Sequence, residues 1–579
     1  MQQLQTGRTG MEDGLDLDVA IIGGGVSGCY TGYRLCSGSY SSGGRPAQVS
    51  LFELSDRIGG RLESVVLPGM EIAGELGGMR YMNSQAIATA LIEDVFASEL
   101  QHVDFSMGDP ATHKFYLRKQ RFWANSWSNG QQQGEPFVTR YDLDPDDVGF
   151  DAYQLFNKVV YDVLMADPAI AGQFGSKMTH PNEWDYNFTL TSQDWDAIKP
   201  VVRYGFPGPY EGLLVNDMGF WNLLKDQCSE EGYSFLADAG GYYSNTINWN
   251  AAEAFENMVG DFTGPNVSYR TIVGGYDQVV SALANAFASQ PGTGVWLGNR
   301  LVRVDQATSG GRRYQLTLWN QQGGSAWLAY ADAVVLAMPR RSLELLDQDC
   351  FLFSPDGGVL PTELARQVPS VLLQPSMKIL MGFEYPWWRD DFGATAGESV
   401  TDLPMRQCYY FGEDPNDSHS LFLASYNDMD TVSFWSPLQA GELFEPHPTA
   451  LVSAEDLEPW RGLQAPGVMV AEAMAQVREL HGPQPSPIPD PYISYCKDWA
   501  EDPFGGGYHA WAAGITVKDV MPFIRQPLGP TEAIHVCGEC YSDLQGWIEG
   551  ALCVAEHTLQ DHFNLSWPSW LPKDYYLGW

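Results

Sequence analysis

A glycine-rich segment near the start of the chain constrains the fold more than any other part of the sequence. Asp18–Ile22 is a short, largely apolar run, typical of a strand buried on both faces of a parallel sheet, and Gly23–Gly28 follows it directly. We expect a helix from there to about Cys36 and a second strand over Gln48–Leu54. This order of strand, turn, helix and strand predicts an α/β fold with a Rossmann-like domain.

The spacing of the glycines, G-x-G-x-x-G, predicts a dinucleotide site at this turn. Gly23 permits the tight turn, Gly25 lets the backbone approach a pyrophosphate, and Gly28 lets the helix pack closely on the strand. The free N–H groups and the dipole at the helix N-terminus favour phosphate. Glu53 lies 25 residues beyond Gly28, near the roughly 20 typical of a carboxylate that accepts from a ribose hydroxyl. The dinucleotide-binding residues predicted here are Gly23, Gly25, Val26, Ser27, Gly28, Glu53 and Leu54.

The segment after Glu53 indicates which dinucleotide is bound. Arg57, Gly59, Gly60 and Arg61 continue it in the pattern E-x-x-x-R-x-G-G-R. Arg61 can reach a phosphate while the two glycines let the backbone come close, which suits a long, permanently held dinucleotide better than NAD. This pattern resembles the signature of the flavin-containing amine oxidase family. The resemblance implies an FAD cofactor whose ADP half lies on the glycine-rich turn.

The C-terminal part of the chain carries a second pattern that resembles this family. Gly538-Glu539 is followed by Gly546-Trp547-Ile548-Glu549-Gly550-Ala551 at the start of an expected helix. The resemblance implies that Glu539 holds the ribityl chain and that the helix N-terminus faces the pyrimidine edge of the flavin, where it would stabilise negative charge on the reduced ring. It also implies that backbone atoms in a later strand contact the adenine. The flavin contacts expected from these patterns are Val302, Glu539, Gly546, Trp547, Ile548 and Ala551.

The cysteines predict neither a disulfide framework nor a covalent flavin. Nine Cys in 579 residues is a modest, odd number. Cys537 and Cys540 have C-x-x-C spacing, but no second pair follows and Glu539 between them is assigned to the flavin, so no metal site is predicted. Family members with a covalent flavin carry Cys in a G-G-C-Y stretch, and Gly507 stands at that position here. We therefore expect non-covalent FAD.

An arginine beside the expected flavin site points to the substrate. Gly77-Gly78-Met79-Arg80 resembles the corresponding segment of the L-amino acid oxidases within the family. A guanidinium in an otherwise apolar pocket needs an anion, and the carboxylate of a substrate amino acid, held as a bidentate fork, provides one. The structural alternative is an internal carboxylate partner or a contact with the flavin alone. All four residues of this segment are also expected to contact the flavin.

Further residues match the substrate site of these oxidases. The resemblance implies that Tyr426 is a second donor to the substrate carboxylate and that Lys378 bridges through water to flavin N5. Tyr508 and Trp547 match the aromatic walls that flank the amine, and the carbonyl of Gly546 is the expected amine acceptor. Aromatic pocket residues also expected are Tyr409, Tyr410 and Trp511.

These residues predict an FAD-dependent L-amino acid oxidase with Arg80, Tyr426 and Lys378 in catalytic roles. A fixed carboxylate would aim the Cα–H at flavin N5. Hydride transfer would leave an imino acid that hydrolyses to a 2-oxo acid and ammonia, while O2 reoxidises the flavin and gives hydrogen peroxide. The base that deprotonates the amine is unassigned. Alternatives are an amino-acid 2-monooxygenase, which releases an amide and CO2, a mono- or polyamine oxidase, and a catalytically idle flavin-fold binding protein.

Charge and hydropathy limit the partners. The chain has 72 Asp and Glu against 33 Lys and Arg, a net charge of −39, which would repel nucleic-acid phosphates and anionic lipid. It has no run of about 18 apolar residues and no apolar stretch near its start, so we expect neither a membrane-spanning helix nor a visible signal peptide. A cytoplasmic location is the default, secretion stays open, and a homo-oligomer is expected. Aromatic residues favour large apolar substrates, whereas the acidic excess would suit basic ones.

Strand patterns of one type near both ends and in the middle predict a domain assembled from separate segments. After a loose lead-in over 1–16, the sequence predicts a helix over Gln85–Leu100, a surface loop over 124–136, mostly helix over 140–260, and strands over 294–304, 314–320 and 327–338. The predicted division is an FAD-binding domain at 16–76, 263–345 and 501–565, an α+β substrate-binding domain at 77–139 and 346–500, and a helical domain at 140–262.

Overall fold

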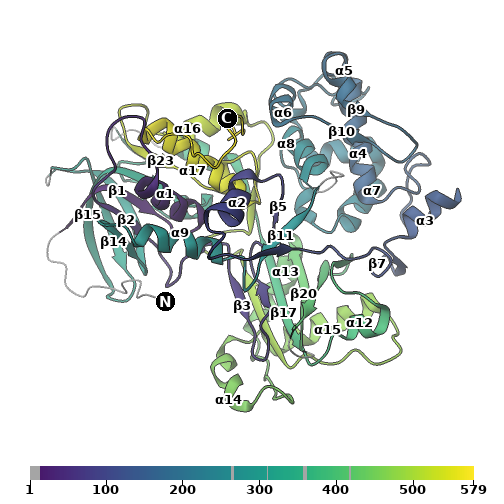
Figure 1. Cartoon of the computed structure of the whole chain (residues 1–579). Helices are drawn as coiled ribbons and strands as arrows, with labels where there is room; N and C mark the ends of the chain where they lie inside the picture. Colours follow the sequence, from purple (N-terminus) through teal and green to yellow (C-terminus); the bar gives the residue numbers. More distant parts are fainter. Residues whose placement is uncertain (1–13, 262–266, 309–310, 356–361, 416–418) are drawn as a thin grey trace.

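The computed structural model of the chain has three parts. It describes residues 14–261, 267–308, 311–355, 362–415 and 419–579; positions 1–13 of the predicted lead-in and the predicted boundary at 262/263 lie outside these residues. A sheet with helices on both faces forms one side of the molecule, a helical part lies above, and a second sheet lies below (Figure 1). The predicted domain boundaries stay a proposal.

The first sheet is the predicted Rossmann-like sheet, which confirms the α/β fold class. Its strands run in the order β12-β2-β1-β15-β14-β13, and β23 pairs with β15. β1 is parallel to both of its neighbours, whereas β14 is antiparallel to β13 and β15. The bounds are β1 (Leu15–Ile22), β2 (Val49–Phe52), β12 (Thr293–Trp296), β13 (Asn299–Gln306), β14 (Tyr314–Asn320), β15 (Ser325–Leu336) and β23 (Ile534–Val536).

Helices cover both faces of this sheet, and this explains the continuous apolar run in β1. Val19 and Ile21 pack on one face in a core shared with α1 (Val26–Ser37), α9 (Gln278–Ala288) and α17 (Ile548–Phe563). Ala20 and Ile22 pack on the other face in a core that includes residues of α16 (Val517–Arg525). Both side-chain sets of the strand are therefore out of water.

The second sheet has the order β21-β17-β20-β19-β18-β7-β8. Its central strands are almost fully buried. Helices α12 and α15 cover one face, and apolar residues of segment 67–79 cover the other. The bounds are β7 (Lys114–Leu117), β8 (Gln120–Trp123), β17 (Ser376–Phe383), β18 (Glu398–Thr401), β19 (Gln407–Glu413), β20 (Ser420–Asp428), β21 (Ile493–Asp498), α12 (Trp387–Phe392) and α15 (Gly467–His481).

The region over 140–260 is mostly helical, as predicted. It contains α4 (Ala152–Ala166), α5 (Pro168–Phe174), α6 (Ser192–Ile198), α7 (Phe220–Ala239) and α8 (Ala251–Glu256). No helix in the described part of the chain is both long and apolar enough to cross a membrane.

Three local predictions are wrong. The single strand predicted over 294–304 is two strands, β12 and β13, which lie at opposite ends of the strand order of the first sheet. The predicted loop over 124–136 contains the helix α3 (Ser126–Gln133), because the buried side chain of Trp127 anchors this otherwise polar segment and Gly134 ends the helix at φ +73°. The helix expected over Gln85–Leu100 is shorter: α2 (Ala86–Ala90) continues as a π-helix over Leu91–Val95 and then ends.

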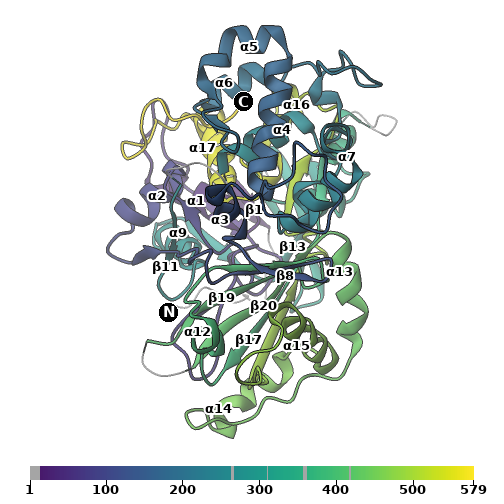
Figure 2. The same ribbon diagram turned by 90° about the vertical axis from the view of Figure 1, so that its right-hand side faces the viewer.

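Short β-pairings connect the three parts of the molecule where they meet. β16 (Val371–Gln374) pairs with β22 (Tyr508–Trp511), and Trp249 of the helical part forms a bridge with Ala512. The view in Figure 2 shows the helical part at the top and the second sheet at the bottom, with β1 between them. The cavity described next lies at this junction.

Candidate active site

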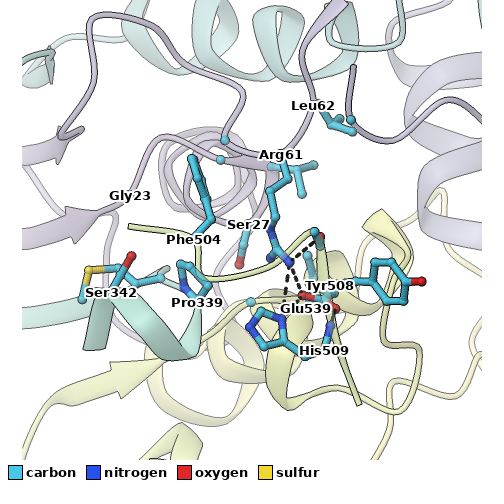
Figure 3. Close-up of a pocket in the computed structure, with 18 of the residues that line it drawn as sticks. Gly23, Ser27, Arg61, Leu62, Pro339, Ser342, Phe504, Tyr508, His509 and Glu539 are labelled. Carbon is cyan, nitrogen blue, oxygen red and sulfur yellow. Dashed lines mark hydrogen bonds and ion pairs between the residues drawn. The ribbon is translucent and has the colours of Figure 1, made fainter. Parts of the chain in front are cut away.

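A cavity of about 500 Å³ brings together most of the predicted site residues. Residues from all three parts line it, although they are far apart in the sequence. Figure 3 shows one region of its wall. The lining includes residues of the β1–α1 turn, of 52–54, 59–62, 77–80, 242–249 and 337–346, and of 502–510 and 538–551.

The β1–α1 turn has a backbone that only glycine fits. Gly23 has φ +109°, and a Cβ there would collide with the carbonyl oxygen of Ala337. A Cβ at Gly28 would collide with the carbonyl oxygen of Gly23, so Gly28 serves helix–strand packing and is not among the lining residues. Glu53 Oε2 accepts from the backbone N–H of Gly24 at 2.6 Å, which fixes the carboxylate at the cavity. The turn thus has the backbone geometry that the predicted dinucleotide site requires.

Replacing Gly23 by alanine is expected to lower the affinity for FAD by about 5- to 150-fold and so to reduce the flavin content of the purified protein, because strain in the turn costs about 1–3 kcal/mol. The ratio of flavin to protein absorbance measures it. Gly44→Ala is the matched control, since Gly44 is exposed and nothing surrounds the position of its Cβ. Wild-type flavin content in Gly23→Ala would contradict the placement of the cofactor on this turn.

Arg61, Glu539 and His509 form a hydrogen-bonded cluster in the cavity wall (Figure 3). Arg61 Nη1 donates to Glu539 Oε2 at 2.7 Å and to the carbonyl of Gly507 at 3.1 Å. His509 Nδ1 lies 3.0 Å from Glu539 Oε2, and the Gly546 N–H donates to Oε1 at 2.9 Å. Burial by itself raises the pKa of Glu539, but Arg61 and His509 hold it well below its usual range. The carboxylate therefore stays ionised and fixed in orientation.

The N-terminus of α17 also lies at the cavity. Trp547 caps the helix, and its indole is stacked on the ring of Tyr269, with 6.5 Å between centroids and 12° between planes. Gly546 has φ +86°, and a Cβ there would lie 3.8 Å from the ring of Tyr508. Ile548 and Ala551, on the first turn, line the cavity as well. The partial positive charge of a helix N-terminus is thus available to a ligand in the cavity.

Arg80 lies in the cavity wall and is 8% exposed. Its guanidinium carbon lies 4.4 Å from the ring centroid of Tyr269 and 5.2 Å from that of Phe105. Nη1 lies 3.0 Å from Met107 Sδ. Across the described ranges no carboxylate oxygen lies within the 4.0 Å of an ion pair with this guanidinium, and Glu398 acts on it only from farther away. Arg80 is therefore a buried cation that faces a cavity without a counter-ion.

Tyr426 and Lys378 lie next to each other on neighbouring strands. Tyr426 lines the cavity, and its ring centroid is 4.4 Å from Lys378 Nζ. Lys378 is 1% exposed and is not among the lining residues; Nζ donates to the carbonyls of Gly77 at 2.6 Å and Glu75 at 3.1 Å. Burial lowers the pKa of Lys378 to about 7. The lysine is thus directly behind the segment that carries Gly77, Gly78, Met79 and Arg80, all of which line the cavity.

The structure does not bring Tyr410 into the cavity, which corrects that expectation. Its hydroxyl is hydrogen-bonded to Ser399 Oγ at 2.6 Å and His481 Nε2 at 2.8 Å, in the core on the opposite face of the second sheet. Tyr409 points to the cavity side, where its hydroxyl lies 3.3 Å from that of Tyr242. Successive side chains of a strand point to opposite faces, and on the second sheet these two faces belong to different cores.

Val302 is also absent from the described lining, although its neighbours Arg300 and Leu301 belong to it. The β13–β14 register shifts between Leu301 and Arg303, so Val302 is the extra residue of a bulge. Its carbonyl accepts from the backbone N–H of Asp347 at 2.9 Å. Trp511, also expected in the pocket, is buried in the core that contains Ala20 and Ile22, where its Nε1 donates to the carbonyl of Ser542 at 3.0 Å. Apart from Gly28, Lys378 and Tyr409, described above, the other predicted cofactor and substrate residues line the cavity: Gly25, Val26, Ser27, Glu53, Leu54, Arg61, Tyr426, Tyr508, Glu539, Gly546, Trp547, Ile548 and Ala551.

Several lining residues were not predicted from the sequence. Tyr242, Ser244 and Gln374 come from segments with no recognisable motif. His509 directly follows the predicted wall residue Tyr508, and this adjacency was the one available signal for it. For Tyr242, Ser244 and Gln374, only the tertiary contacts reveal their place.

Comparison with known proteins identifies the family to which the sequence is similar. The model of a family described as flavin containing amine oxidoreductase matches residues 27–555. Aplysianin-A of Aplysia kurodai is 25% identical, with 95% of this chain and 90% of that protein covered. Achacin of Lissachatina fulica is 23% identical, over 96% and 95%. The L-amino-acid oxidase BmooLAAO-I of Bothrops moojeni is 22% identical, over 92% and 87%.

Among solved structures, wild-type putrescine oxidase bound to putrescine aligns with a TM-score of 0.59, over 95% of this chain and all of that chain, at 17% identity. At this identity the likeness concerns the fold alone.

The glycine cradle, the ionised Glu539 and the helix N-terminus of α17 together fit the pyrophosphate, ribityl and ring portions of a flavin dinucleotide.

Proposed function

Because the chain belongs to the flavin-containing amine oxidoreductase family, we propose that it oxidises L-α-amino acids to 2-oxo acids, with release of ammonia and hydrogen peroxide. FAD is the cofactor, and the resemblance recognised in the sequence is confirmed. Gly507, at the position of the cysteine in covalently flavinylated members, supports non-covalent attachment.

One observation carries the proposal: Arg80 is a buried guanidinium that faces the cavity and has no ion-pair partner in the described parts of the chain. A cation taken out of water costs several kcal/mol unless an anion compensates it. The aromatic rings around Arg80 compensate only part of this cost. A substrate carboxylate would supply the missing charge, whereas a simple amine would leave the guanidinium unpaired.

The remaining substrate contacts follow from this anchor. Tyr426, which lies near Arg80 in the same wall, would donate its hydroxyl to the carboxylate. Tyr508 and Trp547 would flank the amine, and the carbonyl of Gly546 would accept from it. Holding the substrate at both ends fixes the direction of the Cα–H bond, and such positioning lowers the barrier by several kcal/mol.

When bound, FAD supplies the hydride acceptor, N5, and is returned to its oxidised form by O2. Glu53, Glu539 and the N-termini of α1 and α17 would hold it. Lys378, behind the Gly77 segment, would act on the reacting face through water, which is the role that the family resemblance implies. A lysine whose pKa is lowered to about 7 by burial can hold or release a proton near neutral pH.

A peroxide assay with the twenty amino acids, both enantiomers and the corresponding decarboxylated amines tests the proposal. We expect L-amino acids to exceed amines by about 100-fold or more in kcat/KM, because a site built around a polar group rejects analogues that lack its partner. A similar margin over D-amino acids is expected, because a D-amino acid held by the same carboxylate and amine contacts would point its Cα–H bond in another direction. Matched amounts of 2-oxo acid and ammonia are expected. Amide and CO2 would identify a monooxygenase, efficient amine turnover would identify an amine oxidase, and a colourless protein would indicate an idle flavin fold.

The side-chain preference, the predicted homo-oligomer and the predicted location stay predictions. The same substrate panel, read across side chains, decides between large apolar and basic amino acids.

A further inference from the structure

A buried carboxyl group that the proposed mechanism does not use lies just behind the cavity wall. Asp428 is the last residue of β20, two positions after Tyr426, and it is fully buried. Its carboxylate accepts from the backbone N–H groups of Tyr243 at 3.0 Å and Ser244 at 2.9 Å. It therefore joins the second sheet to a turn of the helical part at the edge of the cavity.

Two hydroxyl groups connect this carboxylate with the cavity. The Tyr508 hydroxyl donates to Asp428 Oδ2 at 3.4 Å, and it is also hydrogen-bonded directly to Ser244 Oγ. Tyr508 and Ser244 both line the cavity. In Figure 3 the Tyr508 hydroxyl points away from the cluster of Arg61, Glu539 and His509. The three residues thus form a continuous polar path on the side away from the Arg61 cluster.

The carboxylates among the described lining residues, unlike Asp428 behind the wall, are already engaged in the wall itself. Glu53 accepts from Gly24 and Ser55, Glu539 is paired with Arg61, and Asp502 is paired with Arg341 at 2.7 Å. Oxidation of an amine by hydride transfer requires the neutral amine, but an amino acid is an ammonium ion at neutral pH. The mechanism therefore needs a proton acceptor near the amine, and none of these three carboxylates is free to serve. Lys378 lies outside the cavity lining, and its Nζ is held by the carbonyls of Gly77 and Glu75.

We propose that Asp428 receives the proton of the substrate ammonium through the hydroxyls of Tyr508 and Ser244. The N–H bond of the ammonium breaks and its proton forms a new O–H bond on Ser244 Oγ. The original Ser244 hydroxyl proton moves to the Tyr508 oxygen, and the original Tyr508 hydroxyl proton moves to Oδ2 of Asp428, so both hydroxyls are restored. The substrate becomes a neutral amine, the carboxylate becomes a carboxylic acid, and no electrons are transferred. This role rests on the proposed oxidation of an amine substrate. Asp428 is a positioning residue in the sense that it acts through Tyr508 and Ser244.

The surroundings of Asp428 favour a group that can take up a proton. Burial raises its pKa, whereas the hydrogen bonds from Ser244 and the nearby charge of Arg406 oppose the shift. Arg406 itself lies 3.7 Å from Asp238 Oδ1 and 3.6 Å from the ring centroid of Tyr243, so its charge is shared. The other titratable groups that face Asp428 are the hydroxyls of Tyr508 and Tyr426, both neutral because burial raises their pKa.

The test measures the rate of anaerobic flavin reduction by the substrate. Stopped-flow absorbance monitors this rate from pH 6 to pH 10 in the wild type and in Asp428→Asn. At pH 7 and low substrate concentration, we expect Asp428→Asn to reduce the flavin about 100-fold more slowly than the wild type. This factor is the lower end of the range for general base catalysis. The loss should shrink to within about threefold near pH 10, where bulk solvent supplies the neutral amine. An equal loss at every pH would show a purely structural role and overturn the proposal.

Tyr508→Phe keeps the aromatic wall and removes only the hydroxyl, so it tests the path even if Asp428→Asn does not fold. The same pH-dependent loss is expected, whereas a wild-type pH profile would overturn the proposal. Asp147→Asn is the matched control, because Asp147 is a buried aspartate outside the cavity, paired with Lys158 at 3.2 Å. Its reduction rates should follow the wild-type profile.

Failure of the proton relay through Asp428 can be distinguished from failure of the proposed amino acid oxidation. If the wild-type protein oxidises only amines that lack a carboxylate, the amino acid assignment fails. The same pH series with such an amine still tests the relay, since the proton in question belongs to the amine and not to the carboxylate.

Discussion

The Arg80→Ala variant is expected to lose at least about 30-fold in kcat/KM toward L-amino acids, which corresponds to about 2 kcal/mol of transition-state stabilisation. The reason is that truncation leaves the substrate carboxylate buried and unpaired. Steady-state peroxide formation measures the effect. Flavin absorbance in the same samples verifies that the cofactor remains bound.

Two comparisons isolate the carboxylate contact. Turnover of the decarboxylated amine should not fall in Arg80→Ala, because that substrate has no group for the guanidinium to hold. Arg80→Lys keeps the positive charge but loses the planar fork, so its activity should lie between wild type and Arg80→Ala. If amino acid and amine lose activity in equal proportion, Arg80 has a structural or flavin-binding role, and the assignment to amino acid substrates is withdrawn.

The Glu556→Ala variant is expected to lose about 3–5 kcal/mol in free energy of unfolding, the range for removal of one partner of a buried ion pair. Glu556 is fully buried, and Arg34 of α1 holds it with two bonds of 2.8 and 2.9 Å. The hydroxyl of Tyr30 donates to it at 2.7 Å. These contacts fix α17 to α1, the two helices whose N-termini face the cofactor cavity. Urea unfolding of the holoprotein, followed by circular dichroism and flavin fluorescence, measures the loss.

The double variant Arg34→Met with Glu556→Leu is the matched control. It removes both charges and fills the space with apolar side chains, so it should recover stability to within about 1 kcal/mol of wild type. If Glu556→Ala is as stable as wild type, water or a rearranged partner satisfies Arg34, and the two helices are joined by apolar packing alone.

The sequence alone predicted most residues of the cofactor half of the site, with Val302, the extra residue of a bulge, as the exception. The G-x-G-x-x-G spacing requires glycine for reasons of local geometry, and Gly23 has the positive φ that the motif predicts. Glu53 and the α17 start at Gly546–Ala551 follow motifs whose residues lie close together in the chain. Such local rules depend on backbone conformation over a few residues, so they can be read without knowledge of the fold.

The substrate half was predicted only in part: Arg80, Tyr426 and Tyr508 follow from the sequence, whereas other positions were decided by the tertiary structure. Register shifts in the β19–β20 pairing put Tyr409 on the cavity side and Tyr410 in the opposite core, and a shift of one residue exchanges the two faces of a strand. Ser244 and Asp428 are 184 positions apart and become neighbours only when the helical part packs on the second sheet. Contacts of this kind arise from the burial of whole surfaces, which no short sequence pattern encodes.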